Sequence, residues 1–345
     1  MNRTAQAAVL ALGMLASPSV SALGISAGAD YESEILTVVH SGRLKRVPGS
    51  DTVLAVSRLD PGDPQKVIID TDPAIGYAFR DIDDGLTLVM ALSDPRLEVL
   101  GVTVEFGNTS QRKAYAKARE IVELMGRGHV PVLKGSEFPR AEPSEASRFI
   151  VEQARRYPGR VKILAVGALT NLAAAIQEDP AVVNLLEEVV TVGGNLRADD
   201  RLPGEDFPYD LNYGSDPECA RIVFSSGLAI TLVSIELCRQ FLLEWSRFRG
   251  ATRRGDPVDR YLRRSTVSWF IAGAGRTVAW DVVGLSFVVH PEWFTHAQAR
   301  VLFRVFQAGR PWVTLQIADD GPCLTTLLTE VENQSRFWEW LEVSL

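Results

Sequence analysis

From residue 66 onward, short apolar runs alternate with longer segments in which apolar residues recur every three or four positions. Side chains repeat every two residues along a strand and every 3.6 along a helix, so the runs predict strands and the longer segments predict helices. Strands are expected at residues 67–70, 99–105, 161–166, 189–192 and 230–234. Helices are expected at residues 84–93, 111–126, 145–157, 171–177 and 216–226.

This alternation is typical of an α/β fold in which helices cover both faces of a mostly parallel central sheet. The last third of the chain departs from the pattern. It predicts an amphipathic helix at residues 257–275, an antiparallel strand pair at 301–307 and 312–317, and a closing helix at 336–343. We therefore expect one domain from residue 65 to residue 345, with a small antiparallel C-terminal addition.

The first 22 residues predict a secretory signal peptide. Arg3 precedes a short apolar stretch, and Val20-Ser21-Ala22 has the small residues of a cleavage site. An unstructured extension or a misassigned start would explain the same residues. Residues 23–64 are interpreted as a leader or loosely packed arm. The protein is expected to be periplasmic or secreted if the signal functions, and cytoplasmic otherwise. The apolar stretch is too short to span a membrane, and no membrane partner is expected.

Composition narrows the function. The 345 residues carry a net charge of −7 and no basic stripe, which argues against nucleic acid as a partner. The three cysteines, Cys219, Cys238 and Cys323, have no C-x-x-C spacing. They are interpreted as buried thiols, although one disulfide between two of them is compatible with the sequence.

Acidic residues gather around the end of the first predicted strand. Asp70 and Asp72 follow its apolar run, and Asp81, Asp83 and Asp84 precede the first helix. Crowded carboxylates repel one another unless water or a hard cation compensates for their charge. Ligands of open α/β folds bind at the carboxyl ends of the strands. Since an acidic helix cap needs only one acid, the cluster favours a metal or polyol site.

Polar residues also follow the later strands. Asn108, Thr170, Asp210, Asn212 and Asp281 each lie near a predicted strand end or helix start. Each one alone is equally compatible with a turn or cap. Together they are typical of a polyhydroxy substrate bound through a cation. The sequence has no serine-nucleophile elbow, Cys–His signature or phosphate-binding loop, so we expect chemistry based on carboxylates and metal-activated water.

In their order, these segments resemble the inosine–uridine-preferring nucleoside hydrolase family. The matching pieces are Asp70-Thr71-Asp72-Pro73 with Asp83-Asp84, Gly107-Asn108-Thr109, residues 163–173, Asp210-Leu211-Asn212 and Trp280-Asp281. The resemblance covers residues 66–294. It implies a Rossmann-like nucleoside hydrolase fold and calcium-dependent hydrolysis of the N-glycosidic bond of a ribonucleoside, as in purine or pyrimidine salvage. It also implies a homo-oligomer.

The resemblance further implies roles for individual residues. Asp72 would bind Ca²⁺ and act as general base on the attacking water. Asp84, the carbonyl of Thr170 and Asp281 would complete the calcium ligands from the protein, and Asp83 would be catalytic and hold a ribose hydroxyl. Four more residues would contact the nucleoside: Asn108, Asp210, Asn212 and, by stacking on the base, Trp280.

Two departures from the family pattern leave alternatives open. Residues 74–82 lengthen the spacer before Asp83, and either form a flap or supply Asp81 as a replacement ligand. Trp280 stands where many family members have a histidine that protonates the leaving base, so leaving-group activation is unassigned. The rival interpretations are a calcium-dependent ribose-binding protein without turnover and, with less support, a D-x-D phosphatase.

Overall fold

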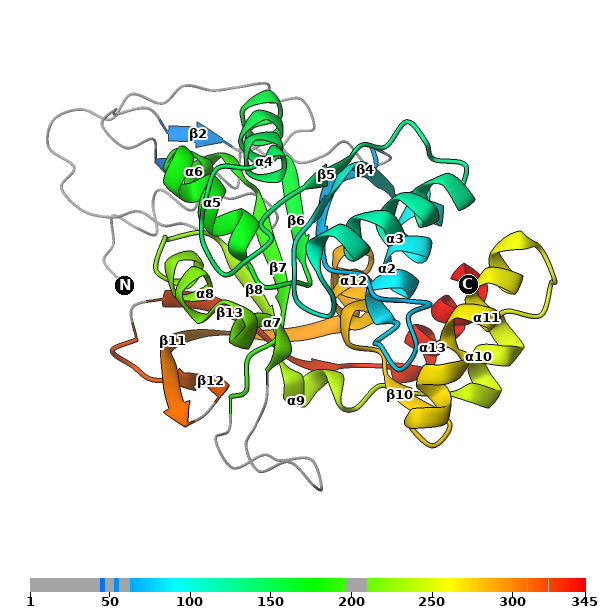
Figure 1. Cartoon of the computed structure of the whole chain (residues 1–345). Coiled ribbons are helices and arrows are strands. Elements are labelled where there is room, and N and C mark those ends of the chain that lie inside the picture. Colours follow the sequence, from blue (N-terminus) through cyan, green and yellow to red (C-terminus); the bar gives the residue numbers. More distant parts are fainter. Residues whose placement is uncertain (1–43, 47–52, 56–62, 197–209, 309, 322) are drawn as a thin grey trace, which may run out of the picture. The chain divides into compact units, whose positions relative to one another are not determined.

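The computed structural model describes residues 44–46, 53–55, 63–196, 210–308, 310–321 and 323–345 (Figure 1). The chain divides into two units, Met1–Asp63 and Pro64–Leu345, which we describe separately. In the first unit, β1 (Leu44–Arg46) pairs with β2 (Val53–Ala55) in antiparallel fashion. The expected signal peptide at residues 1–22 lies outside the described residues and stays a prediction.

The second unit is built on a nine-stranded sheet with the order β12-β11-β13-β8-β7-β6-β3-β4-β5. All neighbours from β13 to β5 are parallel, whereas β11 is antiparallel to both β12 and β13. The strands are β3 (Gln65–Thr71), β4 (Leu97–Val104), β5 (Val132–Lys134), β6 (Val161–Ala165), β7 (Glu188–Val192), β8 (Ile230–Val233), β11 (Phe294–Ala308), β12 (Arg310–Ile317) and β13 (Cys323–Val331). A separate antiparallel pair joins β9 (Leu242–Glu244) to β10 (Arg276–Val278).

The order of strands changes direction at β3. The next strands in the chain, β4 and β5, lie on one side of β3, whereas β6, β7 and β8 lie on the other. Loops that leave the carboxyl ends of β3 and β6 therefore run to helices on opposite faces of the sheet, and ligands of open α/β folds bind at such a point. This switch point is where the acidic segment after β3 meets the loop after β6.

Two apolar cores lie on opposite faces of the sheet. Successive side chains of β3 point to opposite faces, so Val67 and Ile69 belong to one core and Ile68 belongs to the other. The first core is covered by α2 (Asp83–Ser93), α3 (Gln111–Leu124), α9 (Ile235–Cys238), α10 (Trp245–Ala251), α11 (Pro257–Ala272), α12 (Trp280–Val289) and α13 (Gln334–Ser344). The second is covered by α4 (Glu145–Arg156), α5 (Thr170–Glu178), α6 (Val182–Leu185), α7 (Leu211–Ser215) and α8 (Pro217–Phe224) (Figure 1).

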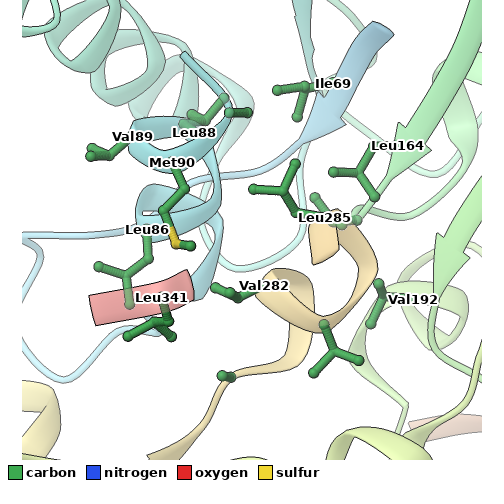
Figure 2. Packing of buried hydrophobic residues seen from close by; sticks show 14 of the residues in the cluster. Ile69, Leu86, Leu88, Val89, Met90, Leu164, Val192, Val282, Leu285 and Leu341 are labelled. Atoms are coloured by element: carbon green, nitrogen blue, oxygen red, sulfur yellow. The ribbon is translucent and has the colours of Figure 1, made fainter. Parts of the chain in front are cut away.

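Helix α12 lies deep in the first core. Its Val282 is near Leu86 of α2, and its Leu285 is near Leu164 of β6 (Figure 2). Gly284 allows the close approach to the sheet, because a Cβ there would lie 2.6 Å from Cγ2 of Val192. The position of α12 matters for the site, since its first turn carries Asp281.

The structure confirms the predicted α/β class, with helices on both faces of a mostly parallel sheet. The antiparallel C-terminal pair is also confirmed, as β11 and β12. Strand β13 was not predicted; it is parallel to β8 and joins that pair to the main sheet. The three cysteines are free and buried. No helix among the described residues is both long and apolar enough to cross a membrane.

We expect Gly284→Ala to lower the free energy of unfolding by about 1–3 kcal/mol, because the added methyl group overpacks the contact with Val192. Gly250→Ala is the matched control, since Gly250 lies in α10 with no heavy atom within 4 Å of its added Cβ. There the better helix propensity of alanine should stabilise the protein by up to about 1 kcal/mol. Urea denaturation measures both changes, and equal effects of the two substitutions would contradict the close packing of α12.

Candidate active site

Asp72 is the first residue after β3, and its carboxylate is enclosed by the loop that follows β4. Asp72 Oδ2 accepts a hydrogen bond from the backbone N–H of Asn108, and Nδ2 of Asn108 lies 3.4 Å from Oδ1. Gly107 makes this contact possible: its φ is +155°, and a Cβ there would lie 1.9 Å from Oδ2 of Asp72. The Gly107-Asn108 pair therefore fixes the direction of a carboxylate that is only 1% exposed.

Asp84 lies in the first turn of α2 and connects that helix to the end of β3. Its Oδ1 accepts from the Thr71 hydroxyl and, at 3.2 Å, from the backbone N–H of Asp72. Its Oδ2 accepts from Nδ2 of Asn108 at 2.9 Å. Asp72, Asp84 and Asn108 thus form one hydrogen-bond network, as expected for residues at neighbouring strand ends.

A second grouping joins α2 to α12. Asp83, Asp84 and Asp281 each place one carboxylate oxygen within 4.8 Å of the oxygens of the other two, and all three side chains are buried. Hard cations such as Ca²⁺ and Mg²⁺ prefer carboxylate oxygen, so this donor set fits such an ion. The geometry includes Asp83 in this group; the carboxylate of Asp72 lies outside the trio, held by Asn108 and next to Asp84.

Burial and mutual repulsion disfavour the charged forms of these acids. Loss of hydration raises the pKa of Asp72 well above its usual value, and the charge of Asp84 raises it further. Burial likewise raises the pKa of Asp83 and that of Asp281, with neighbouring aspartates adding to the effect. A bound divalent cation would oppose both causes, because its charge favours carboxylates over carboxylic acids.

The additional segment at residues 74–82 is an anchored loop. Ile75 and Ile82 are fully buried, the N–H of Gly76 donates to the carbonyl of Ser265 at 3.1 Å, and the N–H of Phe79 donates to Ser268 Oγ at 3.3 Å. At its end, Asp81 Oδ1 accepts from the backbone N–H of Ile82, and burial raises the pKa of Asp81 to about 6. The charge of Asp81 also acts on Asp83 and Asp281, so this loop adds an acid to the cluster.

The loop after β6 carries Thr170, the first residue of α5. Leu169 before it has a φ of 64°, an uncommon conformation for a residue with a branched apolar side chain. The Thr170 hydroxyl donates to Asp216 Oδ2 at 2.8 Å, and Nδ2 of Asn171 donates to Asp70 Oδ1 at 2.8 Å. Asp216 also caps α8, as its sequence predicts.

Sequence analysis missed one residue of this region, Glu105. It follows β4, is fully buried, and accepts hydrogen bonds from the backbone of the loop after β6. The available signal was an acid inside the apolar run Val102-Thr103-Val104-Glu105-Phe106. A buried carboxylate there needs partners, but the partners come from residues more than sixty positions later.

The remaining predicted contacts lie elsewhere around the sheet edge. Asp210 caps α7: its two oxygens accept from the N–H groups of Tyr213 at 3.1 Å and Gly194 at 2.6 Å. Nδ2 of Asn212 donates to the carbonyl of Val192 at 2.9 Å. Trp280 begins α12 and is half-buried against the first core. The predicted contacts of these three residues with sugar and base stay predictions.

Comparison with known proteins gives the family. The sequence model of the inosine-uridine preferring nucleoside hydrolase matches residues 67–339. The chain belongs to the inosine-uridine preferring nucleoside hydrolase family. Uridine nucleosidase 1 of Arabidopsis thaliana is 31% identical over 277 residues, covering 70% of this chain and 78% of that protein. The pyrimidine-specific ribonucleoside hydrolase RihB of Escherichia coli is 25% identical over 221 residues, covering 56% and 67%.

Solved structures agree on the fold of this nucleoside hydrolase. The plant nucleoside hydrolase PpNRh1 superposes with a TM-score of 0.71 at 23% identity, covering 81% of this chain and 98% of that one. The purine-preferring ribonucleoside hydrolase from Gardnerella vaginalis gives 0.70 at 21% identity, with the same shares covered. The predicted family and enzyme class, an N-ribohydrolase, are confirmed.

The pKa of Asp210, raised by burial from 3.8 to about 6, predicts a pH-dependent stability. Because the folded state favours the protonated acid, this stabilising contribution is complete below pH 4 and is lost as pH rises through 6. The loss amounts to about 3 kcal/mol between pH 4 and 7. In urea denaturation, the difference in unfolding free energy between the parent and Asp210→Asn should shrink by about this amount. A constant difference would show that Asp210 is ionised in the folded protein throughout.

Proposed function

We propose that this protein is a calcium-dependent ribonucleoside hydrolase that prefers uridine. The buried group of Asp83, Asp84 and Asp281 carries the proposal, because three converging, buried carboxylates suit a hard divalent cation. Family membership supports the N-glycosidic reaction. The pyrimidine-specific names of several relatives support uridine as the first substrate to test.

The proposed calcium ligands are Asp84 and Asp281 of the buried trio, together with Asp72 beside Asp84 and the Thr170 carbonyl. Asp83, the third member of the trio, is close enough to share this role or to hold a ribose hydroxyl. When bound, Ca²⁺ supplies positive charge that lowers the pKa of a coordinated water and organises the sugar hydroxyls. Asn108 holds Asp72 through its backbone N–H, so the carboxylate keeps one orientation during proton transfer. This hydrogen bond therefore preorganises the Asp72 carboxylate for the reaction.

The proposed reaction is a single displacement. The water oxygen bonds to C1′ of the ribose as the bond from C1′ to the base nitrogen breaks, and the bonding pair leaves with the base. Asp72 accepts the proton of the attacking water, and the released base takes a proton from solvent. Positive charge builds up on the ribose before the new bond is complete, and the surrounding carboxylates stabilise it.

A nucleoside panel tests the function. Purified protein is given uridine, cytidine, inosine and adenosine, with calcium or with excess chelator, and released ribose is measured as reducing sugar. We expect release from uridine first, loss of release with chelator, and recovery when calcium is added back. Calcium-dependent binding of uridine without ribose release would identify a non-catalytic member, and phosphate release from nucleotides without base release would identify a phosphatase.

We expect Asp72→Ala to lower turnover and Asp281→Ala to weaken calcium binding. Loss of the proposed general base should lower kcat by about 10²–10⁴-fold. Loss of the proposed ligand Asp281 should weaken calcium binding at least about tenfold, measured by isothermal titration calorimetry. Asp94→Ala is the control, since Asp94 is a buried acid that follows α2 and pairs with Arg96. Parent-like turnover in Asp72→Ala or parent-like calcium binding in Asp281→Ala would refute the respective role.

Trp280→Ala tests whether the indole stacks on the base. Stacking that is equally strong in the ground state and the transition state affects binding more than chemistry, so KM should rise more than kcat falls. Steady-state kinetics with uridine measures both constants. A fall in kcat at constant KM would instead assign Trp280 to leaving-group chemistry.

A further inference from the structure

The N-terminus of α5 is capped by a residue from another part of the chain. Leu169 occupies the N-cap position, and its side chain makes no capping hydrogen bond. The carboxylate of Glu105 takes this role: Oε1 accepts from the N–H of Leu169 at 3.0 Å and Oε2 accepts from the N–H of Asn171 at 3.1 Å. A carboxylate at this end of a helix satisfies free N–H groups and interacts favourably with the helix dipole.

The backbone around this turn leaves room for the Glu105 carboxylate. A Cβ at Gly167 would lie 2.5 Å from Oε1 of Glu105, so a residue with a side chain would displace it. The left-handed φ of Leu169 costs roughly 1–2 kcal/mol and persists only where surrounding contacts impose it. The two bonds from Glu105 fall on either side of Thr170 and so fix the peptide groups that set the direction of its carbonyl.

The same end of α5 is held from two other directions. Asn171 Nδ2 donates to Asp70 Oδ1, and Asn171 Oδ1 accepts from the N–H of Ser136 at 3.1 Å. Neither contact fixes the backbone between Leu169 and Asn171 directly, whereas Glu105 bonds both flanking amides. Glu105 is therefore the residue whose removal leaves two buried N–H groups of this turn without an acceptor.

We propose that Glu105 is a positioning residue of the metal centre: it clamps the Leu169–Asn171 turn, which carries the proposed calcium ligand Thr170. The inference rests on the proposed calcium site. Groups that orient metal ligands typically change metal affinity 10–100-fold when they are removed. Loss of the clamp should therefore act on calcium affinity and leave the chemistry of the loaded enzyme largely intact.

Two substitutions remove the clamp from opposite sides. Glu105→Gln keeps the shape of the side chain but replaces one acceptor oxygen with an N–H₂ group that faces an N–H donor. Gly167→Ala leaves Glu105 in place and pushes its carboxylate away from the turn. Both variants should raise the calcium dissociation constant about 10–100-fold in isothermal titration calorimetry, with unchanged stoichiometry, and excess calcium should restore kcat.

Each substitution has a matched control. Glu188→Gln changes another buried carboxylate, on β7, which accepts from the Thr231 hydroxyl and pairs with Lys162. Gly128→Ala adds a methyl group that meets no heavy atom within 4 Å. Both controls should keep the calcium constant of the parent, even where the melting temperature falls.

The outcomes separate this inference from the proposed function. A parent that binds no calcium and releases no ribose would refute the proposed function. A parent that does both, while Glu105→Gln and Gly167→Ala keep its calcium constant, would refute the clamp alone. If Glu105→Gln does not fold, Gly167→Ala decides the question by itself. A lower melting temperature with an unchanged calcium constant would show that Glu105 serves only stability.

Discussion

Repulsion between buried carboxylates is the constraint that governs this molecule. Asp72, Asp83, Asp84 and Asp281 are each at most 4% exposed, and their charges act on one another near the end of β3. Burial of like charges opposes folding unless hydrogen bonds or a cation compensate. Hydrogen bonds from the backbone N–H of Asn108 and the hydroxyl of Thr71 partly compensate for this cost. Close packing of α12 against the sheet holds Asp281 in place.

Much of this arrangement could be predicted from the sequence, for identifiable reasons. The acids at 70–84 are local in sequence, and an apolar strand before them places them at the edge of a parallel sheet. The caps at Asp210 and Asp216 follow from short-range rules. Strand β13 escaped prediction because its position depends on pairing with β8, almost a hundred residues earlier. Glu105 escaped because its partners are backbone N–H groups, which no side-chain pattern reveals.

The departures from the family pattern have different structural consequences. The loop at 74–82 is held by two buried isoleucines and by hydrogen bonds to α11, so it is anchored to that helix. Trp280 places an aromatic ring at the first turn of the helix that carries Asp281. The residues proposed to contact the base and the metal are therefore neighbours in one helix, so a change that moves α12 would move both.

The distance along the chain between Asp83 and Asp281 has a consequence for biosynthesis. A ribosome releases the acids of β3 and α2 long before it releases the first turn of α12, because the strands β4 to β8 lie between them in the chain. Contacts of such high sequence separation form late and slowly. Until then the emerging polypeptide carries its acidic segment in water, where the charges cost little. The carboxylate group therefore cannot assemble until α12 has been released, while β11, β12 and β13 of the same sheet are still to follow.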